Sequence, residues 1–155
     1  MFSKAEARER RQAFWTTFGV YMRKHKPTNH PKTKWVNYRT GVRDLYFRLV
    51  ADGRKAQVCI ELQHKDEGIR ALFYEQWKEL RRVFESITSE EWTWVEEVYD
   101  PETYRTLSRI YVEKEGLNHF VKEDWTELFQ FFEKHMVPLD EFWGEFQEVF
   151  KQLES

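Results

Sequence analysis

Hydrophobic residues near the start of the chain recur with the 3.6-residue spacing of an amphipathic helix. They follow Ser3 and Glu6, a spacing that is typical of a helix N-terminus, and a helix is predicted over residues 4–25. Pro27 ends this helix, since proline lacks the backbone N–H that a helix interior requires. A basic loop with embedded aromatic residues is expected over residues 26–40.

The pattern changes to alternation within residues 42–63, where two strand-like runs flank Asp52 and Gly53. An Asp-Gly pair between alternating runs is a strong signal of a β-hairpin. With these two residues at the tip, Phe47 is expected opposite Val58. Both side chains then lie on the face that the alternation predicts to be the core face.

Further helices and a second hairpin are predicted in the rest of the chain. In order they are a helix over residues 67–88 capped by Asp66, strands over 91–99 and 105–113, a helix from Asp124 with Glu127 in a capping box, and a last helix after Pro138. The order α-ββ-α-ββ-α-α predicts an α+β fold, in which an antiparallel sheet of two β-hairpins packs with helices. One domain is expected over residues 1–155, with a core that includes Phe47, Ile60, Phe73, Trp77 and Leu80.

Composition narrows the class of protein. The chain has 7 Trp, 7 Tyr and 13 Phe, which supply large buried areas, and only one cysteine, Cys59, so it forms no intramolecular disulfide. The N-terminus is charged and no apolar run is long enough to span a membrane, so a cytoplasmic protein without membrane contact is expected. No Gly-rich phosphate loop and no His/Cys cluster is present, so no cofactor is expected.

Charge divides the chain into two halves. Residues 1–65 carry 15 Lys and Arg against 5 Asp and Glu, whereas residues 66–155 carry 10 against 22. A basic half with aromatic residues is typical of polyanion binding, because cations neutralise phosphates and rings such as Trp35 and Tyr38 can stack on bases. The residues predicted to bind a polyanion are Arg8, Arg11, Arg23, Lys24, Lys32, Lys34, Trp35 and Arg39. The alternative is a solvated surface that meets the acidic half of the same molecule or of a second copy.

A second candidate site is a pair of carboxylates on the first hairpin. The expected register places Asp44 directly opposite Glu61, and Gln63 continues the same face. Carboxylates on neighbouring strands can hold a divalent cation, as in nucleases of the restriction-enzyme type. Asp44 and Glu61 would then be metal ligands and Gln63 would replace the usual lysine. The alternative is a polar sheet face on which Arg39, Arg43 and Arg48 neutralise the two carboxylates.

The segments AFWTTFGVYMR, GVRDLYFRLVADGRKAQVCIEL, TLSRIYVEKEG, KEDWTELFQFF and LDEFW, with the loop around Trp35, resemble a bacterial family, domain of unknown function 4268. The matching positions are Phe14, Trp15, Trp35, Gly41, Glu61, Leu62, Ser108, Arg109, Ile110, Asp124, Trp125 and Phe142. The resemblance implies an α+β domain without an assigned activity. Many relatives carry this domain behind a nuclease-type domain, which implies a link to nucleic-acid metabolism or defence.

These observations favour a non-enzymatic interaction domain. Its partner would be a protein, a second copy of the chain, or a polyanion such as a nucleic acid. The alternative is a nuclease-like enzyme that depends on a divalent metal and uses Asp44, Glu61 and Gln63. A catalytic role requires the metal, whereas a binding role does not.

Overall fold

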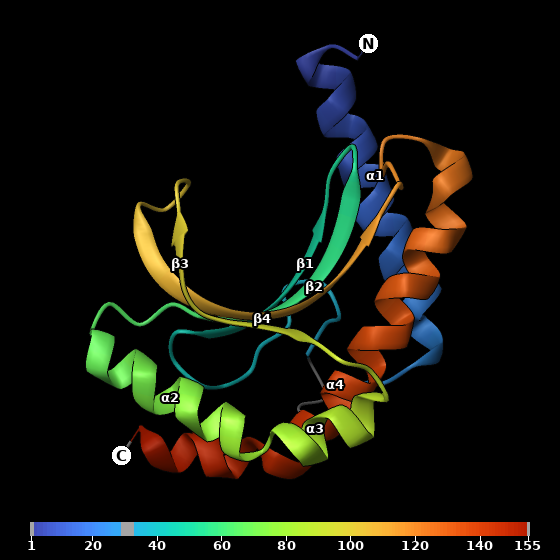
Figure 1. The fold of residues 1–155 in the computed structure, drawn as a ribbon. Helices are drawn as coiled ribbons and strands as arrows, with labels where there is room; N and C mark the ends of the chain where they lie inside the picture. Colours follow the sequence, from blue (N-terminus) through green and yellow to red (C-terminus); the bar gives the residue numbers. More distant parts are fainter. Residues whose placement is uncertain (1, 29–32, 155) are drawn as a thin grey trace.

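A computed structural model describes residues 2–28 and 33–154 (Figure 1). The strands are β1 (Leu45–Ala51), β2 (Lys55–Leu62), β3 (Thr93–Asp100) and β4 (Arg105–Glu115). The helices are α1 (Lys4–Tyr21), α2 (Glu67–Glu79), α3 (Arg81–Thr88) and α4 (Trp125–Leu153), with short 3₁₀ helices at Met22–Lys24 and Lys122–Asp124. The α+β class is confirmed, although the observed order is α-ββ-α-α-ββ-α.

The four strands form one antiparallel sheet in the order β1-β2-β4-β3, so the two hairpins meet through β2 and β4. The sheet is strongly curved (Figure 1). The helices lie along its convex side, and its concave side faces away from them. One face of the sheet therefore supports the core, while the concave face and the edge strand β1 are left to other contacts. No helix among the described residues is long and apolar enough to cross a membrane.

The first hairpin forms where the sequence predicts it, but the expected register is wrong by two residues. Phe47 pairs with Ile60 rather than with Val58. The difference arises in the turn, where the Asp52 carboxylate accepts hydrogen bonds from the backbone N–H groups of Arg54 and Lys55, at 2.8 and 2.9 Å. This Asx-type turn moves the tip one residue along the chain. A shift of two keeps every side chain on its predicted face.

The helical boundaries also differ from the prediction. The helix expected over residues 67–88 is interrupted at Leu80, whose φ of −94° and ψ of 6° leave the helical region. By contrast, α4 runs through Pro138 as one helix. Proline removes one hydrogen bond from the helix, and buried residues on both sides of it, Met136 and Leu139, hold the helix together by packing. Figure 1 shows that α4 changes direction along its length, as expected of a proline kink.

All three predicted helix starts are confirmed, and two of the three expected side-chain caps are formed. The Ser3 hydroxyl accepts a hydrogen bond from Glu6 N–H at 3.1 Å, and the Asp66 carboxylate accepts one from Ile69 N–H at 2.9 Å. Asp124 does not cap α4 with its side chain, because its carboxylate instead accepts the backbone N–H of Asn118 at 2.9 Å.

The core is largely as predicted. Phe47, Ile60, Phe73 and Trp77 are at most 4% exposed, whereas Leu80 is only partly buried. Trp77 lies in an aromatic cluster with α4, in which its ring stacks on Phe142 and Trp143. Phe150 packs against it in a tilted arrangement, with the ring centroids 4.6 Å apart. This cluster joins α2 to the C-terminal half of α4.

Candidate anion-binding groove

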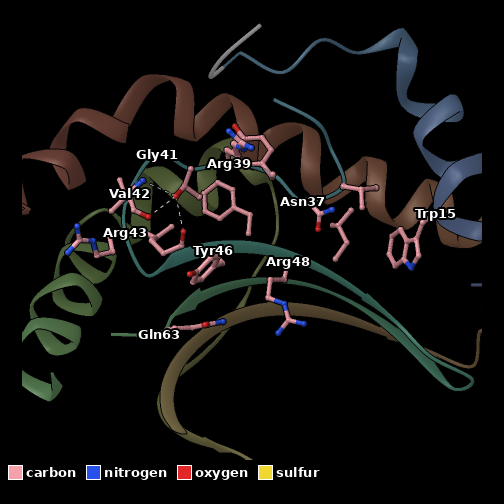
Figure 2. Close-up of a pocket in the computed structure, with 15 residues that line it drawn as sticks. Trp15, Asn37, Arg39, Gly41, Val42, Arg43, Tyr46, Arg48 and Gln63 are labelled. Atoms are coloured by element: carbon pink, nitrogen blue, oxygen red, sulfur yellow. Dashed lines mark hydrogen bonds between the residues drawn. The ribbon is translucent and has the colours of Figure 1, made fainter. Parts of the chain in front are cut away.

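A groove of about 1120 Å³ lies beside the edge strand β1 (Figure 2). One wall is β1, and the other is the segment of residues 36–43. Trp15 of α1 lies near one end, next to Asn37, and Arg43 lies towards the other. The groove is lined by Trp15, Val36, Asn37, Tyr38, Arg39, Thr40, Gly41, Val42, Arg43, Leu45, Tyr46, Phe47, Arg48, Leu49 and Gln63.

The segment 36–43 is held in place by buried polar contacts. The Thr40 hydroxyl donates a hydrogen bond to Leu45 O at 2.8 Å, and Thr40 O accepts one from the Trp143 indole N–H at 2.9 Å. The Tyr38 hydroxyl donates to the buried Asp140 carboxylate of α4. Burial and this carboxylate together raise the pKa of Tyr38 well above its ordinary value, so its hydroxyl stays protonated. The wall therefore has a fixed position relative to β1 and α4.

Three arginines line the groove, and no carboxylate side chain does. Arg39 and Arg43 belong to the segment 36–43 and are exposed, and Arg48 extends from β1. Tyr46, Arg48 and Gln63 lie on one side of β1, and Arg39 lies on the other (Figure 2). The rim of the groove is therefore positively charged from both sides.

One of the three arginines, Arg48, is paired with Glu61, which Arg109 also contacts, so two guanidinium groups share one carboxylate. The Glu154 carboxylate accepts a hydrogen bond from the backbone N–H of Arg43, so this contact does not involve the Arg43 guanidinium group. The Lys151 side chain lies against Gly41, and its ammonium group lies 3.7 Å from a Glu148 oxygen. Gly41 has a φ of 79°, a backbone conformation that favours glycine, which allows the chain to turn beside Lys151.

Glu61 is buried in the middle of the concave face, only 1% exposed. Its Oε1 accepts hydrogen bonds from Arg48 Nη1 at 3.2 Å and Gln63 Nε2 at 2.9 Å, and its Oε2 accepts one from Arg109 Nε at 3.0 Å. Both carboxylate oxygens are thus engaged by donors from β1, from β4 and from the residue after the end of β2. A cation at Glu61 would have to displace guanidinium groups.

The corrected register separates the residues of the alternative metal site. Tyr46, not Asp44, lies opposite Glu61, and Asp44 O accepts the backbone N–H of Gln63 at 2.7 Å, at the start of β1. Within the described residues, no group of three or more His, Cys, Asp or Glu side chains is placed to hold a metal ion. The geometry therefore does not bring Asp44 and Glu61 together as a pair of ligands.

The residues predicted to bind a polyanion, where the structure describes them, lie in α1, in the short 3₁₀ helix after it and in the loop that follows. Arg8, Arg11 and Arg23 are exposed on or just after α1, and Lys34 is exposed in the loop. Lys24 lies 3.1 Å from a Glu133 oxygen of α4. Lys32 lies outside the described residues. Of the members of this set that the structure describes, only Arg39 lines the groove.

The predicted role of Trp35 and Tyr38 as stacking platforms is wrong. They are 7% and 5% exposed, and the Trp35 indole N–H donates to His25 O at 3.2 Å. Both rings are part of the core, so neither can stack on an unpaired base.

Sequence reasoning missed the groove itself and the role of Arg109. Arg43 and Arg48 were considered only as neutralising residues, because nothing local indicates that residues 36–43 run beside β1. Arg109 is the direct partner of Glu61 in the pairing of β2 with β4, which joins segments that are 48 positions apart. The sequence offers one signal for this pair: Glu61 and Arg109 are charged residues of opposite sign within two predicted strands.

The remaining candidates for chemistry are buried core groups. Burial raises the pKa of the Cys59 thiol to about 12, so it is protonated and unreactive near neutral pH. Burial also lowers the pKa values of His64, His119 and His135, which favours their neutral forms. None of these four side chains lines the groove.

The fold and the groove define an α+β domain with helices on one side of a curved sheet and an open edge strand. The family described as "Domain of unknown function (DUF4268)" matches residues 10–147, nearly the whole chain, and the chain belongs to this family. No curated protein and no solved structure matches the chain.

Proposed function

We propose that this domain is a non-enzymatic interaction module that binds an anionic partner in the groove beside β1. The observation that carries the proposal is the lining, which contains Arg39, Arg43 and Arg48 and no carboxylate side chain. Such a concentration of one charge sign in a concave surface raises the local potential and steers ligands of opposite charge. The net charge of the chain is −2, so this potential is local.

The alternative, a nuclease-like enzyme that depends on a divalent metal, has less support. Glu61 is already hydrogen-bonded to Arg48 and Arg109, and the residue opposite it in β1 is Tyr46 rather than Asp44. Divalent cations bind to oxygen ligands that have no stronger competitor. A link of this domain to nucleic-acid metabolism or defence remains part of the proposal, through the anionic partner rather than through cleavage.

The test is retention on a heparin column at about 50 mM salt, a condition at which phosphate-type contacts are strong. The variant Arg39→Ala/Arg43→Ala removes two cations from the groove. The matched control, Arg8→Ala/Arg23→Ala, removes two exposed cations of the same type from the region of α1. We expect the wild type and the control to be retained and the groove variant to elute early. Equal retention of both variants would contradict the groove as the binding site.

The alternative has its own test. Incubation of the protein with single-stranded and double-stranded DNA in Mg²⁺ or Mn²⁺ should leave the DNA intact. Cleavage that Glu61→Gln abolishes, in a variant that still unfolds cooperatively, would establish the enzyme and overturn the proposal.

A further inference from the structure

The edge of β1 carries backbone groups that point into the groove. Asp44 O pairs with Gln63 N–H, and Asp52 N–H pairs with Lys55 O, so both residues face β2. In an antiparallel ladder the two backbone groups of a residue point to the same side, and successive residues alternate. Phe47 and Leu49 therefore direct their N–H and C=O groups away from β2, towards the groove.

Nothing described in the structure pairs with these groups. The corresponding groups of Leu45 are used, since Leu45 N–H donates to Val42 O at 3.4 Å and Leu45 O accepts from the Thr40 hydroxyl at 2.8 Å. Beyond this point, the described residues supply no hydrogen-bond partner for the backbone of Phe47 or Leu49. An edge strand with open donors and acceptors is a template for another strand.

The segment 36–43 leaves this edge accessible while it shapes the groove. Phe47 and Leu49 both line the groove, although the Phe47 side chain is packed into the core against Tyr38 and Trp143. The core packing fixes the strand, so its edge presents four backbone groups in a rigid arrangement. Preorganised main-chain groups beside a groove are the arrangement that binds extended peptides by strand addition.

Resting on the proposed function, we infer that the anionic partner is an acidic, extended peptide segment of another protein, which adds to β1 as a fifth strand. The charge of the rim selects an acidic sequence, and the edge of β1 selects an extended backbone. Nucleic acid fits less well, since it offers no strand of alternating N–H and C=O groups. Of the aromatic rings that line the groove, Tyr38 is buried and gives no stacking platform, whereas Tyr46 is 43% exposed.

The chemistry of the groove further constrains the sequence of this segment. Side chains of an added strand alternate between the two faces of the sheet. On the concave side they would lie beside Tyr46 and Arg48, and on the other side beside Arg39, with Trp15 near one end of the groove. Acidic residues suit the arginines on either side, and branched apolar residues between them favour an extended strand.

The probe is a fluorescent peptide of alternating Glu and Val, about ten residues long, the upper range of ordinary strands. Its affinity is measured by fluorescence anisotropy for the wild type and for the two double variants defined above. A second peptide has the same sequence with N-methyl groups on alternate residues, all along one edge, and a third has them along the other edge. One of the two methylated peptides must then block pairing with β1.

We expect the unmodified peptide to bind, with at least about tenfold weaker binding for the Arg39→Ala/Arg43→Ala variant and for the better-blocked methylated peptide. The Arg8→Ala/Arg23→Ala control should bind as the wild type does. A Leu49→Pro variant removes an N–H that faces the groove rather than β2, so it should weaken the binding of the peptide. The thermal unfolding of this variant is measured to check that it folds. If it does not fold, the methylated peptides give an independent answer.

The outcomes separate the two proposals. Equal binding of all three peptides would overturn strand addition and leave an electrostatic groove. Binding of a single-stranded oligonucleotide without any peptide binding would overturn the peptide partner while the proposed function stands. Self-association that depends on the edge of β1 would assign it to a second copy and also overturn this inference. A wild-type protein that neither is retained on heparin nor binds the peptide would overturn the proposed function itself.

Discussion

Arg109 Nε lies 3.0 Å from Glu61 Oε2 across the two central strands of the sheet, at positions that are direct partners in the β2–β4 register. Arg48 approaches the other carboxylate oxygen from β1. One buried carboxylate thus joins three of the four strands. The hydrogen bonds from these two arginines explain how a glutamate that is only 1% exposed is tolerated in the sheet.

The first prediction concerns this cluster. Glu61→Ala should lower the free energy of unfolding by about 3–5 kcal/mol, because it leaves two guanidinium groups without their buried partner. Glu113→Ala on the same sheet should cost at most about 1 kcal/mol, since its pair with Lys55 is exposed. Urea unfolding of both variants measures the difference. Equal, small losses would show that the cluster contributes little to stability.

A second prediction concerns the dependence of stability on pH. Partial burial alone would raise the pKa of Glu133, but the hydrogen bonds from Tyr21, His25 and Lys24 outweigh it and lower the pKa to about 2. Its ordinary pKa is 4.5. A group whose pKa is depressed in the folded state contributes stability above its unfolded value, and this contribution is lost as the pH falls.

Urea unfolding at several pH values between about 6 and about 3 should therefore show stability falling through the range from about 4.5 towards 2. Glu133→Gln should be less stable near neutral pH and should lose less stability on acidification. Parallel pH profiles for the two proteins would mean that another carboxylate governs the acid response.

The third prediction concerns the aromatic cluster of α2 and α4. Trp77→Ala should cost about 3–5 kcal/mol, because it removes a fully buried ring that contacts Phe142, Trp143 and Phe150. Tyr104 is 82% exposed, so Tyr104→Ala is the matched control and should change stability by less than about 0.5 kcal/mol. The change in the denaturation midpoint measures both. A Trp77→Ala variant as stable as the wild type would contradict the packing of α4 on α2.

The fourth prediction concerns Cys59. The side chain is fully buried and its thiol pKa is raised to about 12 by burial. A thiol reagent such as an aromatic disulfide should therefore react only as fast as the protein opens, and quickly in denaturant. Rapid modification of the native protein would show that the concave face around Cys59 is more open than the structure describes.

Local patterns in the sequence were enough for the hairpins and most helices, because alternation and helical spacing are decided by near neighbours. They also placed Phe47, Ile60, Phe73 and Trp77 in the core. The turn at Asp52 shifted the register because its carboxylate captures two backbone N–H groups, a contact that the Asp-Gly signal does not distinguish. Similarly, Pro138 predicts a break between two helices, although packing on both sides keeps α4 continuous.

The candidate site was far less accessible to sequence reasoning. Which segment lies beside an edge strand depends on contacts between residues far apart in the chain, such as Trp143 with Thr40. The charge split draws attention to the first half, and of the predicted residues that the structure describes only Arg39 lines the groove. The burial of Trp35 is not predicted, because an aromatic residue in a lysine-rich loop gives no local sign of burial.

The most direct test of the central claim, an anionic partner in the groove beside β1, is an amide ¹H–¹⁵N NMR titration with a short heparin fragment at low salt. We expect the largest shifts for amides of residues 37–49, and we expect them to fade as the salt concentration rises. Shifts that centre on Arg8, Arg11 and Arg23 would place the anion on α1 and contradict the claim, as would a spectrum that the fragment does not change.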